Sequence, residues 1–222
     1  MGIRFINKLF HNARVHIKHG KKGIEQIGHR AYVGGMWDEI GFLQFNFLLQ
    51  KGLEKSHTLL DLGCGSLRAG VHFIKFLDPG NYIGIDKEDL LIDLGIKDEL
   101  DELIIIEKKP QFIISDKFDF KTLNKKIDFA IAHSLFTHLP PIIIHKCLIN
   151  LHPYMKKESK FYATFFLSEK INKNPKLPHD HKNFKYTLDQ ILQFGKSNQY
   201  SSNYIGHWDH PRDQVMVEFI TI

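Results

Sequence analysis

The chain of 222 residues contains little cysteine and no long apolar run. Its two cysteines, Cys64 and Cys147, lack the spacing to further ligands that is typical of metal sites, so reduced thiols are expected. No apolar run approaches the roughly 18 residues of a membrane span. The first ten residues have neither the apolar core nor the cleavage site of a secretory signal. We therefore expect a cytoplasmic protein without a transmembrane segment.

Hydrophobic residues make up 43% of the chain and charged residues 25%, which is the balance of a globular domain of ordinary size. The formal net charge is +5 and the pI is near 9.0. A positive charge permits an acidic substrate or a nucleic acid but requires neither. We favour a lysine-rich solvated surface, because no nucleic-acid-binding module accompanies the charge.

One stretch, H-T-L-L-D-L-G-C-G-S-L-R-A-G, organises the rest of the chain. Residues 58–62 are an apolar run typical of a strand that is buried on both faces of a parallel sheet. Gly63, Cys64 and Gly65 follow at once, and a helix is predicted after them. Glycines allow the backbone to turn sharply and approach a ligand, and the helix N-terminus presents free N–H groups. The pattern predicts a nucleotide-cofactor site.

The nature of the cofactor depends on two positions in this stretch. Arg68 stands where a dinucleotide fingerprint G-x-G-x-x-G would have its third glycine, and Asp61 precedes the first glycine. The pattern D-x-G-x-G resembles motif I of the class I S-adenosylmethionine (SAM)-dependent methyltransferases. SAM carries a sulfonium and an ammonium group and no phosphate, so a carboxylate beside the loop suits it.

Two segments together, Y-V-G-G-M-W-D-E-I-G-x-x-Q and G-C-G-S-L-R-A-G, resemble a bacterial subgroup of these enzymes that acts on small molecules or glycans. The resemblance implies that residues 1–55 form a helical cap over the cofactor and that residues 56–222 form the methyltransferase domain. Basic and apolar residues alternate between Arg4 and Lys22. They could form an amphipathic helix on a membrane or polyanion, but we favour packing on the domain itself.

Strands and helices alternate beyond residue 78. Residues 82–86 are predicted to be a second strand ending at Asp86, which lies 86 − 65 = 21 residues after Gly65, at the spacing of an acid that binds a ribose. Residues 88–108 are predicted to be a helix that breaks near Gly95. Strands are also expected at 112–114, 127–132 and 161–167, with Asp116 and His133 following the first two.

The C-terminal part predicts an antiparallel hairpin. A helix is expected over 187–194 with Gly195 ending it, and two β-rich runs, 200–205 and 215–222, follow without a helix between them. The fold class is therefore expected to be α/β. The resemblance makes it a Rossmann-like methyltransferase fold with a mainly parallel seven-stranded sheet, a C-terminal hairpin and an N-terminal helical cap.

The site residues are inferred from the strand ends and from the resemblance, because ligands bind beyond the carboxyl ends of parallel strands. The residues expected around the cofactor are Tyr32, Gly35, Trp37, Asp61, Gly63, Cys64, Gly65, Arg68, Asp86, Lys87, Asp116, His133 and Ser134. The residues expected around the methyl acceptor are Ser134, His179, His181, Trp208, His210 and Arg212. The candidates for a general base are His133, His138 and His207, with His133 ranked first.

The residues directly after the fourth predicted strand narrow the chemistry. The Asn/Asp-Pro-Pro-aromatic sequence that accompanies methylation of a base amine is replaced by Ala132-His133-Ser134-Leu135, and no cysteine nucleophile lies at this edge. We expect O-methylation of a small hydroxylated, sugar- or phosphate-bearing metabolite, surface-glycan precursors included. An RNA methyltransferase and a non-catalytic SAM-binding subunit remain alternatives. H-D-H and H-W-D-H could hold a metal, but no metal is expected, because their spacing is not that of a typical site.

Overall fold

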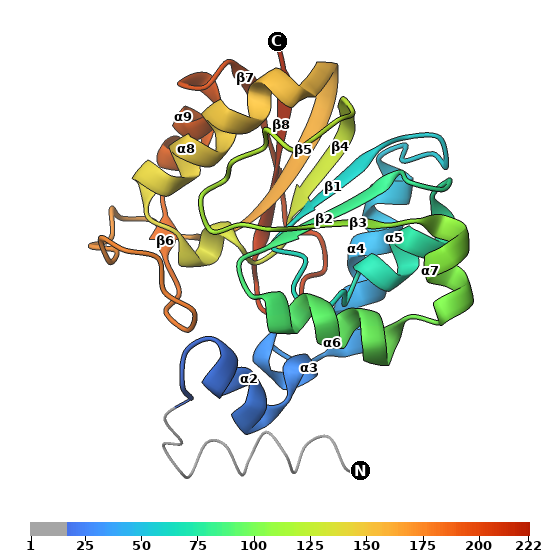
Figure 1. Cartoon of the computed structure of the whole chain (residues 1–222). Coiled ribbons are helices and arrows are strands. Elements are labelled where there is room, and N and C mark those ends of the chain that lie inside the picture. Colours follow the sequence, from blue (N-terminus) through green and yellow to red (C-terminus); the bar gives the residue numbers. More distant parts are fainter. Residues whose placement is uncertain (1–16) are drawn as a thin grey trace.

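The computed structural model describes residues 17–222 (Figure 1). The predicted basic amphipathic segment falls mainly on residues 1–16 and so lies outside the described residues. None of the helices in residues 17–222 combines the length and the apolarity that a membrane crossing needs.

A mixed sheet with the strand order β3-β2-β1-β4-β5-β8-β7 forms the centre of the molecule. Its strands are β1 (Leu59–Leu62), β2 (Tyr82–Asp86), β3 (Gln111–Ile114), β4 (Ile127–Ala132), β5 (Met155–Leu167), β7 (Tyr200–Gly206) and β8 (Val215–Thr221). The first five are parallel, and β8 runs antiparallel to both β5 and β7. The predicted fold class is confirmed, including the C-terminal hairpin.

One further strand, β6 (Lys185–Tyr186), pairs in parallel with the end of β5. It was not predicted, because two residues inside a polar stretch show no alternation of apolar and polar side chains. Strand β5 also begins earlier than the predicted residue 161, since its first part is polar and largely exposed.

Helices cover both faces of the sheet. Figure 1 shows α8 (Pro141–Leu151) and α9 (Leu188–Lys196) on one face, and α4 (Trp37–Gln50), α5 (Gly70–Phe76), α6 (Asp89–Glu99) and α7 (Glu102–Lys108) on the other. The short helices α2 (Lys21–Ile27) and α3 (His29–Tyr32) lie beside α6, and two 3₁₀ turns, η1 (Phe136–His138) and η2 (His152–Tyr154), flank α8.

Two hydrophobic clusters fill the layers between sheet and helices, because successive side chains of a strand point to opposite faces. In β4, Ala130 and Ala132 belong to the cluster beneath α8 and α9, whereas Phe129 and Ile131 belong to the cluster beneath α4 and α5. Strands β1 and β4 are buried on both faces, as the apolar runs of the sequence predicted.

Two glycines that were predicted to break or end helices lie inside them. Gly95 lies inside α6, which ends at Glu99, so the break falls later than predicted, and Gly195 lies one residue before the end of α9 at Lys196. A Cβ on Gly95 would lie 2.7 Å from the carbonyl oxygen of Ser66, and one on Gly195 would lie 1.9 Å from Ser202 Oγ. Each glycine therefore allows its helix to pack closely on a neighbouring segment, which the sequence alone cannot distinguish from a helix stop.

We expect Gly95→Ala to destabilise the protein by about 1–3 kcal/mol, because overpacking outweighs the roughly 1 kcal/mol that alanine gains in a helix interior. Urea denaturation followed by circular dichroism measures the change. Lys97→Ala, an exposed position of the same helix, is the matched control and should be near neutral. A stabilised Gly95→Ala variant would contradict the close packing of α6 on the glycine loop.

Candidate active site

The loop after β1 and the end of β2 form one hydrogen-bonded unit. Gly63 and Gly65 have φ values of 72° and 54°, which favour glycine. The amide of Gly65 donates to Asp86 Oδ2 over 2.9 Å, and the amide of Glu88 donates to Asp86 Oδ1 over 3.0 Å. These bonds hold the Asp86 carboxylate against the glycine loop, although burial still raises its pKa.

The second carboxylate, Asp61, is 4% exposed and lies within β1 next to the same loop. It accepts a hydrogen bond of 2.8 Å from the hydroxyl of Tyr82. Burial raises the pKa of Asp61 to about 7, more than the Tyr82 hydrogen bond lowers it. Neither Asp61 nor Asp86 forms an ion pair within residues 17–222. A buried and a half-buried carboxylate without ion-pair partners suit a ligand that brings positive charge.

The segments that follow β1 and β4 each contain a non-glycine residue with a left-handed backbone. Leu67 has φ 69° in the turn before α5, and Ser134 has φ 56° after β4. Ser134 is held by four hydrogen bonds. Its amide donates to Thr164 Oγ1 over 2.7 Å, and Thr137 donates to its carbonyl over 2.8 Å. Its hydroxyl donates to Gln214 Oε1 over 3.0 Å and accepts from Gln214 Nε2 over 2.8 Å. Such strained conformations persist where surrounding contacts fix them, and they cluster at functional sites.

A pair of buried histidines lies beyond the end of β4. His133 and His210 are 8% and 6% exposed, and their Nε2 atoms are 2.9 Å apart. His133 Nδ1 lies 3.3 Å from an Arg68 nitrogen that can only donate, so the His133 proton is assigned to Nε2. Burial, together with the charge of Arg68, lowers the pKa of His133 well below its usual range. Burial likewise lowers the pKa of His210 to about 4, so both rings are neutral at pH 7.

Two arginines connect this edge to the turn before α4. Arg68 Nη1 donates to the carbonyl of Gly35 over 2.8 Å, and Arg212 donates to the carbonyl of Gly34. Both glycines have positive φ values, 63° at Gly35 and 100° at Gly34, so the turn presents consecutive carbonyls to the guanidinium groups. The segment predicted to form a cap is therefore attached to the glycine loop through Arg68 and to the β7–β8 loop through Arg212.

Asp180 forms a second attachment of the N-terminal segment. Its Oδ2 lies 3.1 Å from both His19 Nδ1 and the Tyr32 hydroxyl, and its Oδ1 accepts from Lys87 Nζ over 2.5 Å. These contacts hold the pKa of Asp180 well below its usual range, even though burial acts in the opposite direction. Asp180 thus joins the 168–186 segment, the residues before α4 and the residue that follows Asp86.

Potential metal ligands also come together at Asp180. Within residues 17–222, ligand atoms of His19, Asp180 and His181 lie within 4.8 Å of one another. The Asp180 carboxylate already accepts from Lys87 and Tyr32, and His181 Nε2 lies 3.2 Å from the carbonyl of Lys18. The cluster is therefore satisfied by hydrogen bonds of the chain itself.

The structure does not bring every predicted site residue to the histidine pair. His207 is exposed, so His210 rather than His207 is the residue of the β7–β8 loop that reaches His133. His138 ends η1 and contacts the carbonyl of Lys182, and His179 lies beside His19. Asp116 is exposed after β3.

Three further side chains expected at the site, two tryptophans and a thiol, pack against other side chains of the protein. Trp208 is 7% exposed, donates to the carbonyl of Gln214 over 2.9 Å and packs against Phe47, and its ring also contacts the rings of His133 and His210. Trp37 lies beneath the guanidinium of Arg30, and the Cys64 side chain is buried. Burial raises the pKa of the Cys64 thiol well above its usual range, so a thiolate is not available there.

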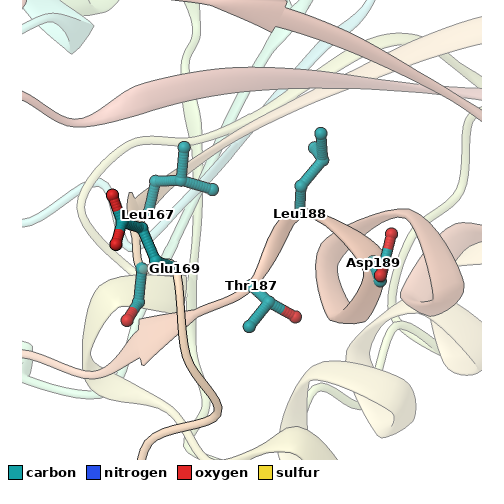
Figure 2. A pocket seen from close by; sticks show the side chains of 6 residues that line it. Leu167, Glu169, Thr187, Leu188 and Asp189 are labelled. Carbon is teal, nitrogen blue, oxygen red and sulfur yellow. The ribbon is translucent and has the colours of Figure 1, made fainter.

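A hollow on the surface lies beside the end of β5 and the start of α9. Figure 2 shows Leu167 and Glu169 on one side of it and Leu188 and Asp189 on the other, with Thr187 between them. Its lining contains no histidine, arginine or lysine. It includes none of the residues that surround the glycine loop or the histidine pair, so we place the candidate site at those residues and not here.

Sequence reasoning missed several residues that shape the site. Tyr82, Thr164 and Gln214 are ordinary strand or loop residues whose partners lie between 21 and 80 positions away. Asp180 stands inside the H-D-H sequence, of which only the two histidines were predicted to be site residues. Only the folded chain shows that its partners are Lys87 and Tyr32.

The order of strands, the C-terminal hairpin and the position of the glycine loop define the Rossmann-like fold of class I SAM-dependent methyltransferases. No protein-family model matches the chain. Magnesium protoporphyrin IX methyltransferase from Synechocystis with bound SAM is similar, with a TM-score of 0.66 and 14% identity over 99% of this chain and 96% of that chain.

Two other solved structures give the same result. The glycopeptide N-methyltransferase MtfA has a TM-score of 0.64 and 14% identity over 82% of this chain and 90% of that chain. A TehB-like SAM-dependent methyltransferase from Corynebacterium glutamicum has a TM-score of 0.59 and 16% identity over 89% of this chain and 94% of that chain. At these identities the similarity establishes the fold.

We expect Asp180→Ala to loosen the N-terminal segment. Losing hydrogen bonds to a charged group worth about 1–2 kcal/mol in total should speed amide exchange in α2 and α3 roughly 5- to 30-fold, while β1 and β4 stay protected. Hydrogen–deuterium exchange with mass spectrometry resolves these segments. Asp209→Ala, an exposed acid on the β7–β8 loop, is the control. Unchanged exchange in α2 and α3 would show that Asp180 does not hold them.

Proposed function

We propose that the protein is a SAM-dependent methyltransferase that O-methylates a small hydroxylated, sugar- or phosphate-bearing metabolite. The observation that carries this proposal is the pair of carboxylates beside the glycine loop, buried Asp61 and half-buried Asp86, neither of which forms an ion pair within residues 17–222. If the loop bound a pyrophosphate, the negative charge of that ligand would lie next to these two carboxylates and be repelled by them. A cationic, phosphate-free cofactor fits the same donor set.

The residues at the carboxyl edge have distinct roles in this proposal. Asp86, fixed by the amides of Gly65 and Glu88, accepts hydrogen bonds from the ribose hydroxyls. Asp61 offsets the positive charge of the cofactor's amino-acid part. Gly63 and Gly65 allow the backbone to approach the cofactor closely. When bound, SAM supplies an electrophilic methyl group on its sulfonium, and the protein aligns the acceptor oxygen with it.

His133 is the proposed base for the acceptor's hydroxyl proton, because it lies beyond the end of β4 and its lowered pKa keeps it neutral at pH 7. Both of its ring nitrogens are engaged, Nδ1 by Arg68 and Nε2 by His210. Since the proton of His133 is assigned to Nε2, only Nδ1 can accept the hydroxyl proton, and the acceptor therefore has to replace the contact of Nδ1 with Arg68. His210 takes the place that His207 had in the sequence-based ranking, and Ser134 orients the acceptor. No metal takes part in the proposed reaction.

The proposal is tested first by binding. Calorimetric titration with S-adenosylhomocysteine should show binding to the wild type, and Asp86→Ala should weaken it by roughly 1–3 kcal/mol, as expected for lost hydrogen bonds to a charged group. Asp93→Ala, an exposed acid on α6, is the matched control. Unchanged affinity of Asp86→Ala would remove Asp86 from the cofactor site.

Binding should also depend on pH. The pKa of Asp61 is about 7, so acidification from pH 8 to pH 6 neutralises the carboxylate that faces the cofactor's ammonium group. We expect the affinity for S-adenosylhomocysteine to fall about tenfold over this range, because one pKa unit below the midpoint only about a tenth of the group is ionised. Asp61→Asn should bind weakly and without this pH dependence. A flat profile in the wild type would contradict the assigned role.

Turnover tests the base. A mass-spectrometric search of a host extract incubated with labelled SAM identifies the methylated acceptor. With that acceptor at saturation, His133→Ala should lower turnover by at least about a hundredfold while affinity for S-adenosylhomocysteine stays near normal. His207→Ala is the control for an exposed histidine. If only the Michaelis constant for the acceptor rises, His133 orients the acceptor and His210 is the next candidate for the base.

A further inference from the structure

Arg68 is a buried cation whose hydrogen-bonding capacity is incompletely used. Its side chain is 7% exposed, and its nitrogens contact the carbonyl of Gly35 over 2.8 Å and His133 Nδ1 over 3.3 Å. Its Nε is buried and has no hydrogen-bond partner among the described residues. A buried guanidinium without a counter-ion is costly, because desolvation is not offset by an opposite charge.

Arg68 has no ion-pair partner among the described residues. No carboxylate of residues 17–222 lies within 4.0 Å of Arg68 or Arg212, whereas Arg30 pairs with Glu99 at 2.6 Å. Residues 1–16 contain neither aspartate nor glutamate, so they cannot supply one either. The terminal carboxylate follows β8 beside Gln199, at the end of the strand away from the β7–β8 loop. The charge of Asp61 raises the pKa of Arg68, but Asp61 is bonded to Tyr82 and forms no ion pair with Arg68. A counter-ion in direct contact with Arg68 therefore has to come from outside the chain.

Arg212 adds a second positive charge at the same place. It follows His210 closely in the β7–β8 loop, and its backbone amide lies 3.2 Å from His210 Nδ1. After burial, the charge of Arg212 is the next cause that lowers the pKa of Arg68, to about 10. The His133–His210 pair lies next to both arginines, so this part of the site presents N–H donors and positive charge.

We propose that Arg68 and Arg212 form a subsite for an anionic group, a carboxylate or a phosphate, of the small molecule that binds at this edge. The proposal rests on the proposed function, since two molecules could carry the group: the cofactor, on its amino-acid part, or the methyl acceptor. In the ligand-free structure, the guanidinium groups donate hydrogen bonds to the carbonyls of Gly34 and Gly35 instead. Charged acceptors form stronger hydrogen bonds than carbonyls, so the anion would compete with the turn before α4.

The cost of the unpaired charge gives a test that needs no substrate. Replacing a buried, poorly paired charge by an apolar residue of similar volume is often neutral or stabilising. We expect Arg68→Met to keep or raise the melting temperature of the ligand-free protein and to lose the increase that ligands produce. An Arg68 that served only to tether Gly35 would instead lower the melting temperature when removed and leave ligand affinities unchanged, which would overturn the proposal.

Calorimetry identifies the source of the anion. The variants are Arg68→Met, Arg212→Met and the control Arg30→Met, whose arginine has a carboxylate of its own. The probes are S-adenosylhomocysteine, 5′-methylthioadenosine, which lacks the amino-acid carboxylate, and inorganic phosphate or acetate added to the S-adenosylhomocysteine complex. A loss of about tenfold or more for S-adenosylhomocysteine in Arg68→Met, with 5′-methylthioadenosine unaffected, assigns the cofactor's carboxylate.

A loss of phosphate or acetate binding with unchanged S-adenosylhomocysteine affinity assigns the acceptor's anion instead. If Arg68→Met changes neither, or if Arg30→Met changes the same affinities, the subsite does not exist. Failure of the proposed function is distinguishable, because wild-type protein would then bind neither nucleoside probe. The dependence of phosphate and acetate binding on Arg68 would still be measured on the ligand-free protein.

Discussion

The hydrogen bond from the Gly65 amide to Asp86 Oδ2 is the contact on which the site depends. It joins the loop after β1 to the end of β2 and positions a carboxylate that the sheet alone would leave free to turn. Gly65 has a left-handed backbone, which favours glycine, and a Cβ there would lie 2.9 Å from Val33. The same glycine therefore fixes the acid and leaves room for the segment before α4.

The N-terminal segment is held at two separate places, and their chemistry differs. Asp180 binds it near His19 and Tyr32 with a carboxylate that has several donors around it. Arg68 and Arg212 bind the turn at Gly34 and Gly35 through neutral carbonyls only. The first attachment is satisfied by the chain, whereas the second leaves positive charge uncompensated. A ligand anion would act on the second attachment and leave the first intact.

The sequence predicted the parts of this arrangement that depend on local pattern. Buried strands with Asp61, Asp86 and His133 at or next to their ends are expected from apolar runs and from the rule that parallel strands end at one edge. The sequence could not show which of His207 and His210, three positions apart in one loop, lies next to His133. The choice is made by long-range packing, since Trp208 inserts against Phe47 and bonds to Gln214. The predicted helix break at Gly95 was wrong for a similar reason, because Gly95 packs against Ser66, which belongs to another segment of the chain.

Charges of opposite sign are buried at one sheet edge yet kept apart. Asp61 and Asp86 lie at the β1–β2 side, where Tyr82 and backbone amides engage them, and Arg68 turns instead toward Gly35 and His133. The charge of Arg68 favours ionisation of Asp61, but burial outweighs it and the pKa stays raised. The fold thus forgoes an internal ion pair that would stabilise the ligand-free protein. A ligand that carries both a cation and an anion can pair with the carboxylates and with Arg68 at once. The free energy that the ligand-free protein does not gain from an internal ion pair then contributes to the affinity for that ligand.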